Sequence, residues 1–490
     1  MRKIIEPQMQ FGQVDISDIS FDLRSRDEIP KLLMGLQYIY CTPEIRKQVF
    51  KILEEMVPEG TDTNNGRPGM LLWKILVLGT IRLNCNWDYD KVKEMADNHI
   101  TLRLMLGHIA WEDEYLYPIQ TIKDNISLFT PEILDRINKI VVKAGHNLVK
   151  KNEKLRGRCD SFVVETDVHY PTDINLLFDA IRKVITLVAG VCDRLGLSPW
   201  RQSAHNLSKL KRLYRTAQSL KRSRAKKREK VEERKKRIEK AHREYTDSAE
   251  AYLEKAQETI NFLLETNRLT VITYDTIRYY MRHAMRQIDQ IRRRVLEGET
   301  IPHTEKVFSI FEEHTEWIAK GKAGVPQELG LKVCLVEDQY GFFLNHLVMR
   351  KTTDDKVAVP FMRETKEKFP DLVSCSFDKG FYSPSNRKQL EKVLDLVVLP
   401  KKGRRNGEEK AFESSDEFVR QRMKHSAVES GINALENHGL DRCFDHGLRG
   451  LKRYVALAVV SRNIQILGTI LWKRKPKRLQ LEEVQKRKAA

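Results

Sequence analysis

The chain has 490 residues, 41% of them hydrophobic, and a formal net charge of +19. This length allows two to four domains with real cores, and so large an excess of lysine and arginine favours nucleic acid, before an anionic membrane, as partner. The seven cysteines show no C-x-x-C spacing, which argues against a disulfide framework and a zinc site and favours a reducing cytoplasm. The opening MRKIIEPQMQF lacks an apolar stretch, so we expect no secretory signal.

Residues 1–150 are predicted to be an all-α domain. Apolar residues recur at helical spacing in PEIRKQVFKILEEMV (43–57) and DYDKVKEMADNHITLRLMLG (88–107), and MLLWKILVLGTIRL (70–83) is strongly apolar. Short helices with tight connections are typical of a helix-turn-helix DNA reader, although a helical domain without that function has the same pattern.

A strand pattern follows, in RCDSFVVETDVHYPTD (158–173), and it contains four acidic residues. Strands usually avoid aspartate, so a carboxylate inside this apolar run points to a specific role. Asp173 is explained as the N-cap of the next helix, whereas Asp160 and Asp167 both stay open as functional acids. We assign residues 151–198 to the first part of a catalytic domain.

Residues 199–325 are predicted to be a basic helical insertion, built as a long helix or a helical hairpin. Between residues 221 and 240, twelve side chains are lysine or arginine and four are glutamate. We expect Lys226, Lys227 and Arg228 to contact phosphates, with a solvated charged helix as the alternative.

Strands return in residues 326–475, the second part of the catalytic domain, before a basic tail at 476–490. LKVCLVEDQYGFFLNHLVMR (331–350) predicts a hairpin, and helices then alternate with the strands DLVSCSFD and LDLVVLP. This order predicts a mixed sheet flanked by helices. The apolar segment 454–472 has Arg462 and Asn463 at its centre, which favours a buried terminal helix over a membrane span.

Carboxylates on such a sheet can hold Mg²⁺, and two ions about 3.5–4 Å apart promote in-line phosphoryl displacement. Asp378 is a candidate because its strand ends there and Lys379–Gly380 turns the chain away, although a turn-capping role has the same pattern. The late helix offers Glu429 and Glu436, seven residues apart, with His425 four residues before Glu429. Spacing alone does not choose between the two glutamates.

Several segments together resemble the DDE transposases of bacterial insertion sequences, in the broad superfamily of insertion sequences four and five, and within it the ISNCY group. They are GRPGM (66–70), DSFVVETDVHYPTD, SFDKGFYSP, HSAVESGINALENHGLDRC and RGLKRYVALAVVSRNIQILG. Together with the helical N-terminal part, they cover most of the chain apart from the basic insertion.

The resemblance implies an RNase H-like mixed-sheet catalytic domain, interrupted by the insertion and preceded by the DNA-binding helices. It places the catalytic acids, which would also be the metal ligands, at Asp160, Asp378 and Glu429, with Asp167 as the alternative to Asp160. The implied cofactor is Mg²⁺, for which Mn²⁺ substitutes. Implied partners are double-stranded DNA, at the element ends and the target, and a second copy of the chain. Further DNA contacts are expected from a set of basic side chains: Lys379, Arg404, Arg405, Arg422 and His425.

Two departures from the family pattern stand out. The Y-x2-R-x3-E-x6-K signature is not matched around Glu429, where Arg422, His425 and Glu436 occur instead, and the insertion is helical and lies between the first two aspartates. The expected activity is cleavage at the inverted ends of the element and joining to target DNA. Alternatives are a catalytically silent DNA-binding protein, a basic helical protein that coats nucleic acid, and a nuclease that cuts without joining.

Overall fold

The computed structural model describes residues 3–6, 8–22, 24–57, 69–109, 114–149, 153–222, 228–319 and 327–489, and their side chains except at 221–230 and 475–489. The chain divides into two compact units. Unit 1 comprises Met1–Asp167 and Ile318–Ala490, and unit 2 comprises Val168–Trp317. The fold is mostly helical with one mixed sheet, so the predicted α/β class is confirmed.

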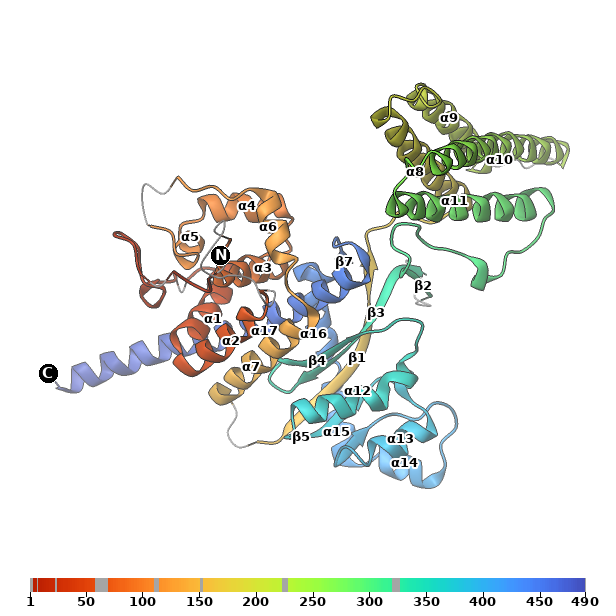
Figure 1. Cartoon of the computed structure of the whole chain (residues 1–490). Helices are drawn as coiled ribbons and strands as arrows, with labels where there is room; N and C mark the ends of the chain where they lie inside the picture. Colours follow the sequence, from red (N-terminus) through yellow and green to blue (C-terminus); the bar gives the residue numbers. More distant parts are fainter. Residues whose placement is uncertain are drawn as a thin grey trace. The chain divides into compact units, whose positions relative to one another are not determined.

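The sheet of unit 1 is centred on β1, which pairs antiparallel with β3 on one side and parallel with β5 on the other. Beyond β3 lies β4, antiparallel to it, and beyond β5 lies β6, parallel to it. The short strands β2 and β7 pair with β3 and β1. The strands, labelled in Figure 1 where space allows, are β1 (Leu155–Thr166), β2 (Glu316–Ala319), β3 (Gln327–Asp338), β4 (Phe343–Val348), β5 (Leu372–Phe377), β6 (Leu396–Val398) and β7 (Arg442–Cys443). The predicted hairpin and the predicted alternation of strands and helices are confirmed.

The N-terminal part of unit 1 is helical, as predicted, with an isolated bridge between Gln13 and Ile109. Its α-helices are α1 (Ile29–Cys41), α2 (Pro43–Glu54), α3 (Leu72–Asn84), α4 (Tyr89–Asn98), α5 (Ile100–Met105), α6 (Ile119–Ile126) and α7 (Pro131–Val149). The chain does not divide at residue 150, however, because these helices and the sheet share one hydrophobic core. On α7, for example, Gly145 leaves room for the ring of Phe342, and the Asn138 amide donates to the Phe343 carbonyl oxygen (3.1 Å).

The terminal helix α17 (Gly447–Ala489) is the centre of this shared core, packed against α1, α3, α7 and β4. In the described part of the chain, its portion Gly447–Arg474 is the one helix long and apolar enough to cross a membrane, and 67% of its apolar window is buried in the protein. The helix is buried in the core, as predicted, and the contacts of Asn463 show how its polar centre is accommodated there. The Asn463 amide donates to Asn138 (2.7 Å) and to the Phe343 carbonyl (2.8 Å), so a polar group at the helix centre is satisfied by protein partners.

Five shorter helices cover the C-terminal half of the sheet: α12 (Asp354–Lys368), α13 (Pro384–Leu390), α14 (Gly407–Glu413), α15 (Asp416–His425) and α16 (Ala427–Leu435). The sequence predicted one continuous late helix, but the structure breaks it at Ser426 into α15 and α16. Glu429 therefore lies in the first turn of a new helix, and Glu436 lies beyond the end of α16 in a separate helical turn.

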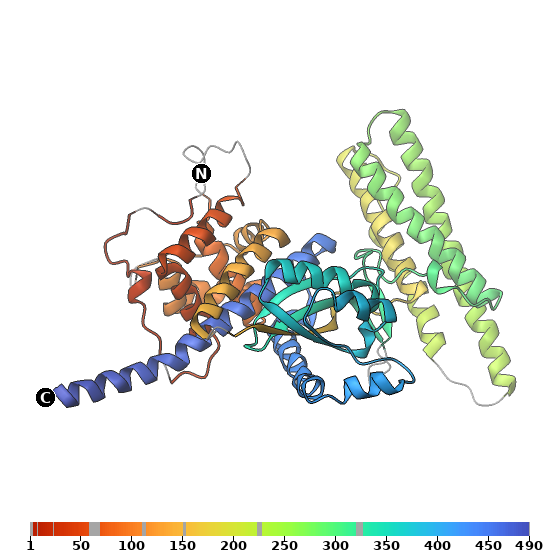
Figure 2. The ribbon, with the colours of Figure 1, turned by 90° about the horizontal axis from the view of Figure 1, so that it is seen from below.

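Unit 2 contains four long helices with their own hydrophobic core: α8 (Asp173–Arg194), α9 (Ser203–Arg222), α10 (Arg228–Glu265) and α11 (Val271–Ile291), drawn in yellow to green in Figure 2. The predicted boundary at residue 199 falls inside unit 2, because α8 buries its apolar face among these helices. The predicted N-cap is corrected. The hydroxyl of Thr172 caps α8, while Asp173 forms an ion pair with Arg294 (2.8 Å).

Candidate active site

The sheet brings two predicted acids side by side. Cys159 on β1 is paired in register with Phe377 on β5, so Asp160 and Asp378, the next residues, lie at adjacent positions of two neighbouring parallel strands. In-register residues of adjacent strands point to the same face of a sheet. Asp378 also has the capping role considered for it, because its carboxylate accepts a hydrogen bond from the Gly380 backbone N–H (3.4 Å).

Helix α16 brings the third acid. It contacts β1, and Glu429 is exposed in its first turn. Gly431 allows the approach, because a Cβ at that position would lie 2.6 Å from Glu337 Oε1 and 3.0 Å from Phe343 Cζ. The preceding helix is attached by its last residue, His425, whose Nδ1 lies 2.9 Å from the Ser376 hydroxyl of β5.

Electrostatics indicate that the three acids, together with a fourth, are close enough to repel one another. Burial is the largest cause that raises the pKa of Asp160 from 3.8 to about 6. The negative charges of Asp378, Glu429 and Asp354 add to this rise, and the hydrogen bond from the Ser161 N–H opposes it. Asp167 does not contribute to this shift. It is exposed beyond the end of β1, where it lies 3.6 Å from Arg442.

The fourth acid, Asp354, was missed by the sequence analysis. It opens α12, where its two carboxylate oxygens accept hydrogen bonds from the Ser161 hydroxyl and the Lys332 ammonium, each at 2.8 Å. Gly380 borders both Asp354 and Asp378, since a Cβ there would lie 3.3 Å and 3.6 Å from their Oδ2 atoms. The sequence signal was the TDD triplet preceding the predicted helix, a typical acidic first turn.

A buried ion pair lies next to these acids and was also missed. Arg158 on β1 donates to Glu337 on β3 (2.8 Å), and both side chains are largely buried. Burial raises the pKa of Glu337 to about 7, opposed by the guanidinium of Arg158. Arg158 and Asp160 are two residues apart on β1 and so share one face of the strand. The guanidinium of Arg158, held by Glu337, therefore lies on the same face of β1 as Asp160.

Carboxylate oxygens are the ligands that Mg²⁺ prefers, and a cation would relieve the repulsion that raises the pKa of Asp160. The donor set therefore fits the ion in its chemistry. Among the residues that the structure describes, however, no three carboxylate, histidine or cysteine side chains are grouped closely enough to hold a metal ion. Binding an ion would require at least one of the acids to turn toward the others.

The side chains predicted to contact DNA differ in their exposure and in their partners. Lys379, Arg404 and Arg422 are exposed in unit 1. Arg405 forms an ion pair with the buried Glu413 (2.9 Å), which gives it a structural role. Burial lowers the pKa of His425, which favours the neutral ring at neutral pH and weakens the case for a phosphate contact.

The predicted contacts of the insertion are not tested. Lys226 and Lys227 lie outside the described residues, as does the side chain of Arg228 at the start of α10.

No known protein family, curated protein or solved structure matches this chain. The function of the chain is therefore argued from its sequence, its fold and its site.

Proposed function

We propose that the protein is a DDE-type transposase with an RNase H-like catalytic domain, which cuts DNA at the ends of its element and joins those ends to target DNA. The proposal rests on three acids that approach one another from separate elements: Asp160 from β1, Asp378 from the end of β5 and Glu429 from α16. Their mutual repulsion helps to raise the pKa of Asp160. A site that concentrates carboxylates and perturbs one of them is a typical place for phosphoryl-transfer chemistry.

The arrangement of the sheet supports the RNase H-like part of the proposal. In the order β4-β3-β1-β5-β6, only β3 runs against the others, and the first acid lies on the central strand. Acids at the middle of β1 and just beyond β5 are held by hydrogen-bonded strands, so their backbone positions are rigid.

In the proposed reaction, the oxygen of water attacks a phosphodiester at the element end, the P–O3′ bond breaks, and a 3′-hydroxyl and a 5′-phosphate result. The 3′-hydroxyl then attacks a target phosphodiester, so one P–O bond forms as another breaks. Asp160, Asp378 and Glu429 would hold Mg²⁺ or Mn²⁺, which activates the attacking oxygen and stabilises the leaving one. Asp354, held by Ser161 and Lys332, would restrict the position of the strand segment that carries Asp160.

The net charge of +19 supports DNA as the polyanionic partner. For the all-α N-terminal segment, recognition of the element ends is part of the same proposal. Pairing of two ends implies at least a dimer in the DNA complex.

The test uses labelled DNA carrying the inverted repeats that flank the gene, with Mg²⁺ or Mn²⁺ and with a chelator. Wild type should nick and join these ends only with metal, whereas Asp160→Asn, Asp378→Asn and Glu429→Gln should each lose at least about a hundredfold in rate. Asp167→Asn is the matched control, because it removes a nearby carboxylate that lies outside the cluster. If Asp167→Asn abolishes cutting and Asp160→Asn does not, the assignment of the first acid is wrong.

A second candidate function is that of a catalytically silent DNA-binding protein. One observation favours it, namely that the described acids are not grouped closely enough to hold an ion. Titration of the wild type with Mn²⁺, followed by its electron paramagnetic resonance signal, separates the two candidates. Stoichiometric binding that is lost in Asp160→Asn supports the enzyme, whereas sequence-specific DNA binding without any Mn²⁺ uptake supports the silent protein.

A further inference from the structure

Within unit 2, positive charge is concentrated on α9 and not on the longer helix α10. The 20 residues of α9 include six lysines or arginines and no aspartate or glutamate. The 38 residues of α10 include nine lysines or arginines but also ten acidic residues. Helix α9 has fewer basic residues than α10, but its positive charge is not offset by acidic residues of the same helix.

The cations Lys211, Arg212 and Arg215 of α9 are exposed, on the face that points away from the core of unit 2. Leu210 and Ala217 are fully buried, whereas the opposite side of the helix lines a shallow groove of about 490 Å³. The residues that line this groove, which we name the α9 cationic face, are Ser208, Lys211, Arg212, Arg215, Thr216 and Ser219. Successive members of this set are three residues or one residue apart and so form one stripe along the helix.

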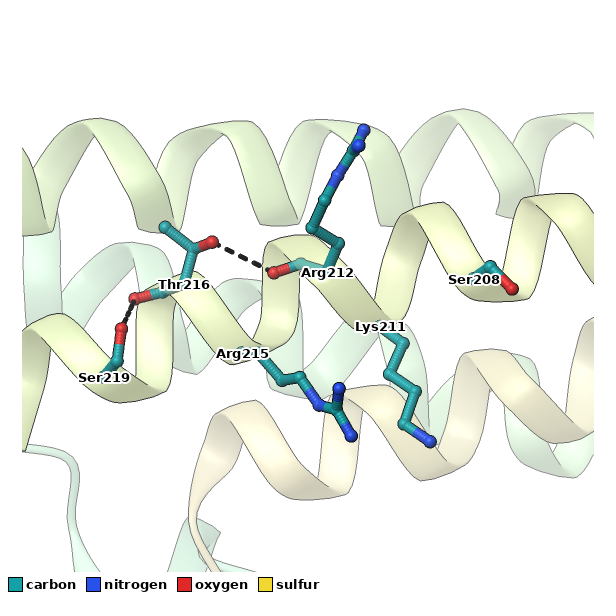
Figure 3. Close-up of a pocket in the computed structure, with 6 residues that line it drawn as sticks. All are labelled: Ser208, Lys211, Arg212, Arg215, Thr216 and Ser219. Carbon is teal, nitrogen blue, oxygen red and sulfur yellow. Dashed lines mark hydrogen bonds between the residues drawn. The ribbon is translucent and has the colours of Figure 1, made fainter.

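Figure 3 shows how the three long side chains of this face are arranged. Lys211 and Arg215 extend toward the same side of α9, and Arg212 extends toward the other side. Small hydroxyl residues flank these cations along the helix, of which Thr216 and Ser219 donate to carbonyl oxygens of their own helix (3.0 Å each). The three cationic side chains are exposed and therefore accessible to a ligand.

The ion-pair pattern distinguishes the two helices. In the described part of the chain, Lys211, Arg212 and Arg215 form no ion pair within 4.0 Å. Three cations of α10, by contrast, are each paired with a glutamate four residues away: Lys235–Glu239, Arg237–Glu233 and Lys240–Glu244. Lysine and arginine without acidic neighbours are the groups that release counterions when they neutralise phosphates.

We propose that the α9 cationic face binds the phosphodiester backbone of duplex DNA independently of base sequence. Its stripe from Ser208 to Ser219 is about 16 Å long at a rise of 1.5 Å per residue, which matches about five base-pair steps of 3.4 Å. Three unpaired cations over this length complement a backbone that carries one charge per about 1.7 Å of duplex. The proposal deepens the proposed function and rests on it for the choice of DNA as the polyanion.

The test is a matched pair of triple variants in the full-length protein. Lys211→Gln, Arg212→Gln and Arg215→Gln remove the face, whereas Lys235→Gln, Arg237→Gln and Lys240→Gln on α10 make the same change in net charge at cations that are already paired. Affinity for a fluorescent duplex of arbitrary sequence is measured by anisotropy in a chelating buffer from 50 to 300 mM salt. Circular dichroism of both variants verifies that the helices are retained.

The α9 variant should bind at least about tenfold more weakly near 100 mM salt, and the slope of log affinity against log salt should become shallower by about two to three. The α10 variant should change affinity less than threefold. Equal losses of affinity in both variants would attribute the effect to net charge and overturn the proposal. An α9 variant with unchanged DNA affinity would also overturn it. This holds even if that variant loses binding to anionic vesicles, since the face would then bind a membrane and not DNA.

Because the binding assay contains no divalent metal and uses no element end, its failure leaves the proposed catalytic site untouched. Conversely, loss of cleavage in Asp160→Asn with normal duplex binding does not bear on α9.

Discussion

The carboxylate of Asp160 should destabilise the folded protein at neutral pH when no cation is bound, so Asp160→Asn should stabilise it. Burial and three neighbouring acids raise the pKa of Asp160 from 3.8 to about 6, and this difference corresponds to about 3 kcal/mol at pH 7. Because the side chain is only half-buried, solvent screening reduces the expected gain to about 2 kcal/mol.

The gain should depend on pH with a definite sign. Below about pH 4 the carboxyl is protonated in both the folded and the unfolded chain, so it carries no penalty. Between about pH 4 and pH 6 the folded chain holds the proton more tightly than the unfolded chain, so the stability of the wild type falls as the pH rises. Above about pH 6 the penalty is complete, and the advantage of Asp160→Asn is largest.

Because a chain of two compact units is not expected to unfold in one two-state step, the assay must report on unit 1 alone. Hydrogen exchange of peptides from β1 and β5, measured by mass spectrometry in urea at pH 4 and pH 7.5, gives the local free energy of unfolding. Asp167→Asn is the control and should change it by less than about 0.5 kcal/mol. A variant at Asp160 that is no more stable than wild type at pH 7.5, or whose gain is equal at both pH values, would refute the electrostatic reasoning.

Three further substitutions test how the site is held. Gly431→Ala places a Cβ 2.6 Å from Glu337 Oε1, so α16 should shift. The cleavage rate should then fall at least about tenfold and the free energy of unfolding by about 1–3 kcal/mol. The control is Gly190→Ala, at a helical glycine with open space around it, which should stabilise unit 2 in urea unfolding. Asp354→Asn loses charge-assisted bonds to its serine and lysine partners, and single-turnover assays should show slower cleavage with unchanged DNA affinity. Arg158→Met leaves the Glu337 carboxyl buried without its partner and should cost about 3–5 kcal/mol in urea unfolding at pH 8, a loss that falls as the pH drops below about 7. An equal loss at pH 5 and pH 8 would contradict the assignment of that pair.

Several features of the candidate site were accessible from local patterns. The placement of Asp378 at the end of β5 follows from an apolar run that stops before Lys379–Gly380, and the β3–β4 hairpin follows from its turn. The buried state of α17 follows from the polar residues at its centre. In each case the deciding residues are neighbours along the chain.

Other features were not accessible, because they depend on partners far apart in sequence. The fourth acid, Asp354, is recognisable only once its bond to Ser161 is known, since those residues are 193 positions apart. Likewise, nothing in the charge count predicts that Arg405 is engaged by Glu413, or that His425 faces Ser376 instead of solvent. The predicted domain boundary at residue 199 falls inside unit 2 for the same reason, because an amphipathic helix such as α8 does not specify which core it covers.

By itself, the sequence determined the α/β class, the order of strands and helices, the basic character and the candidate acids. These depend on hydrophobic periodicity, turn residues and composition, which act over a few residues. Only the tertiary structure decided that Asp160 lies beside Asp378, that Asp167 does not join them, and that Gly431 lets α16 reach the sheet. Strand register and helix packing are long-range, because each is specified by the complementarity of two surfaces that the linear chain keeps apart.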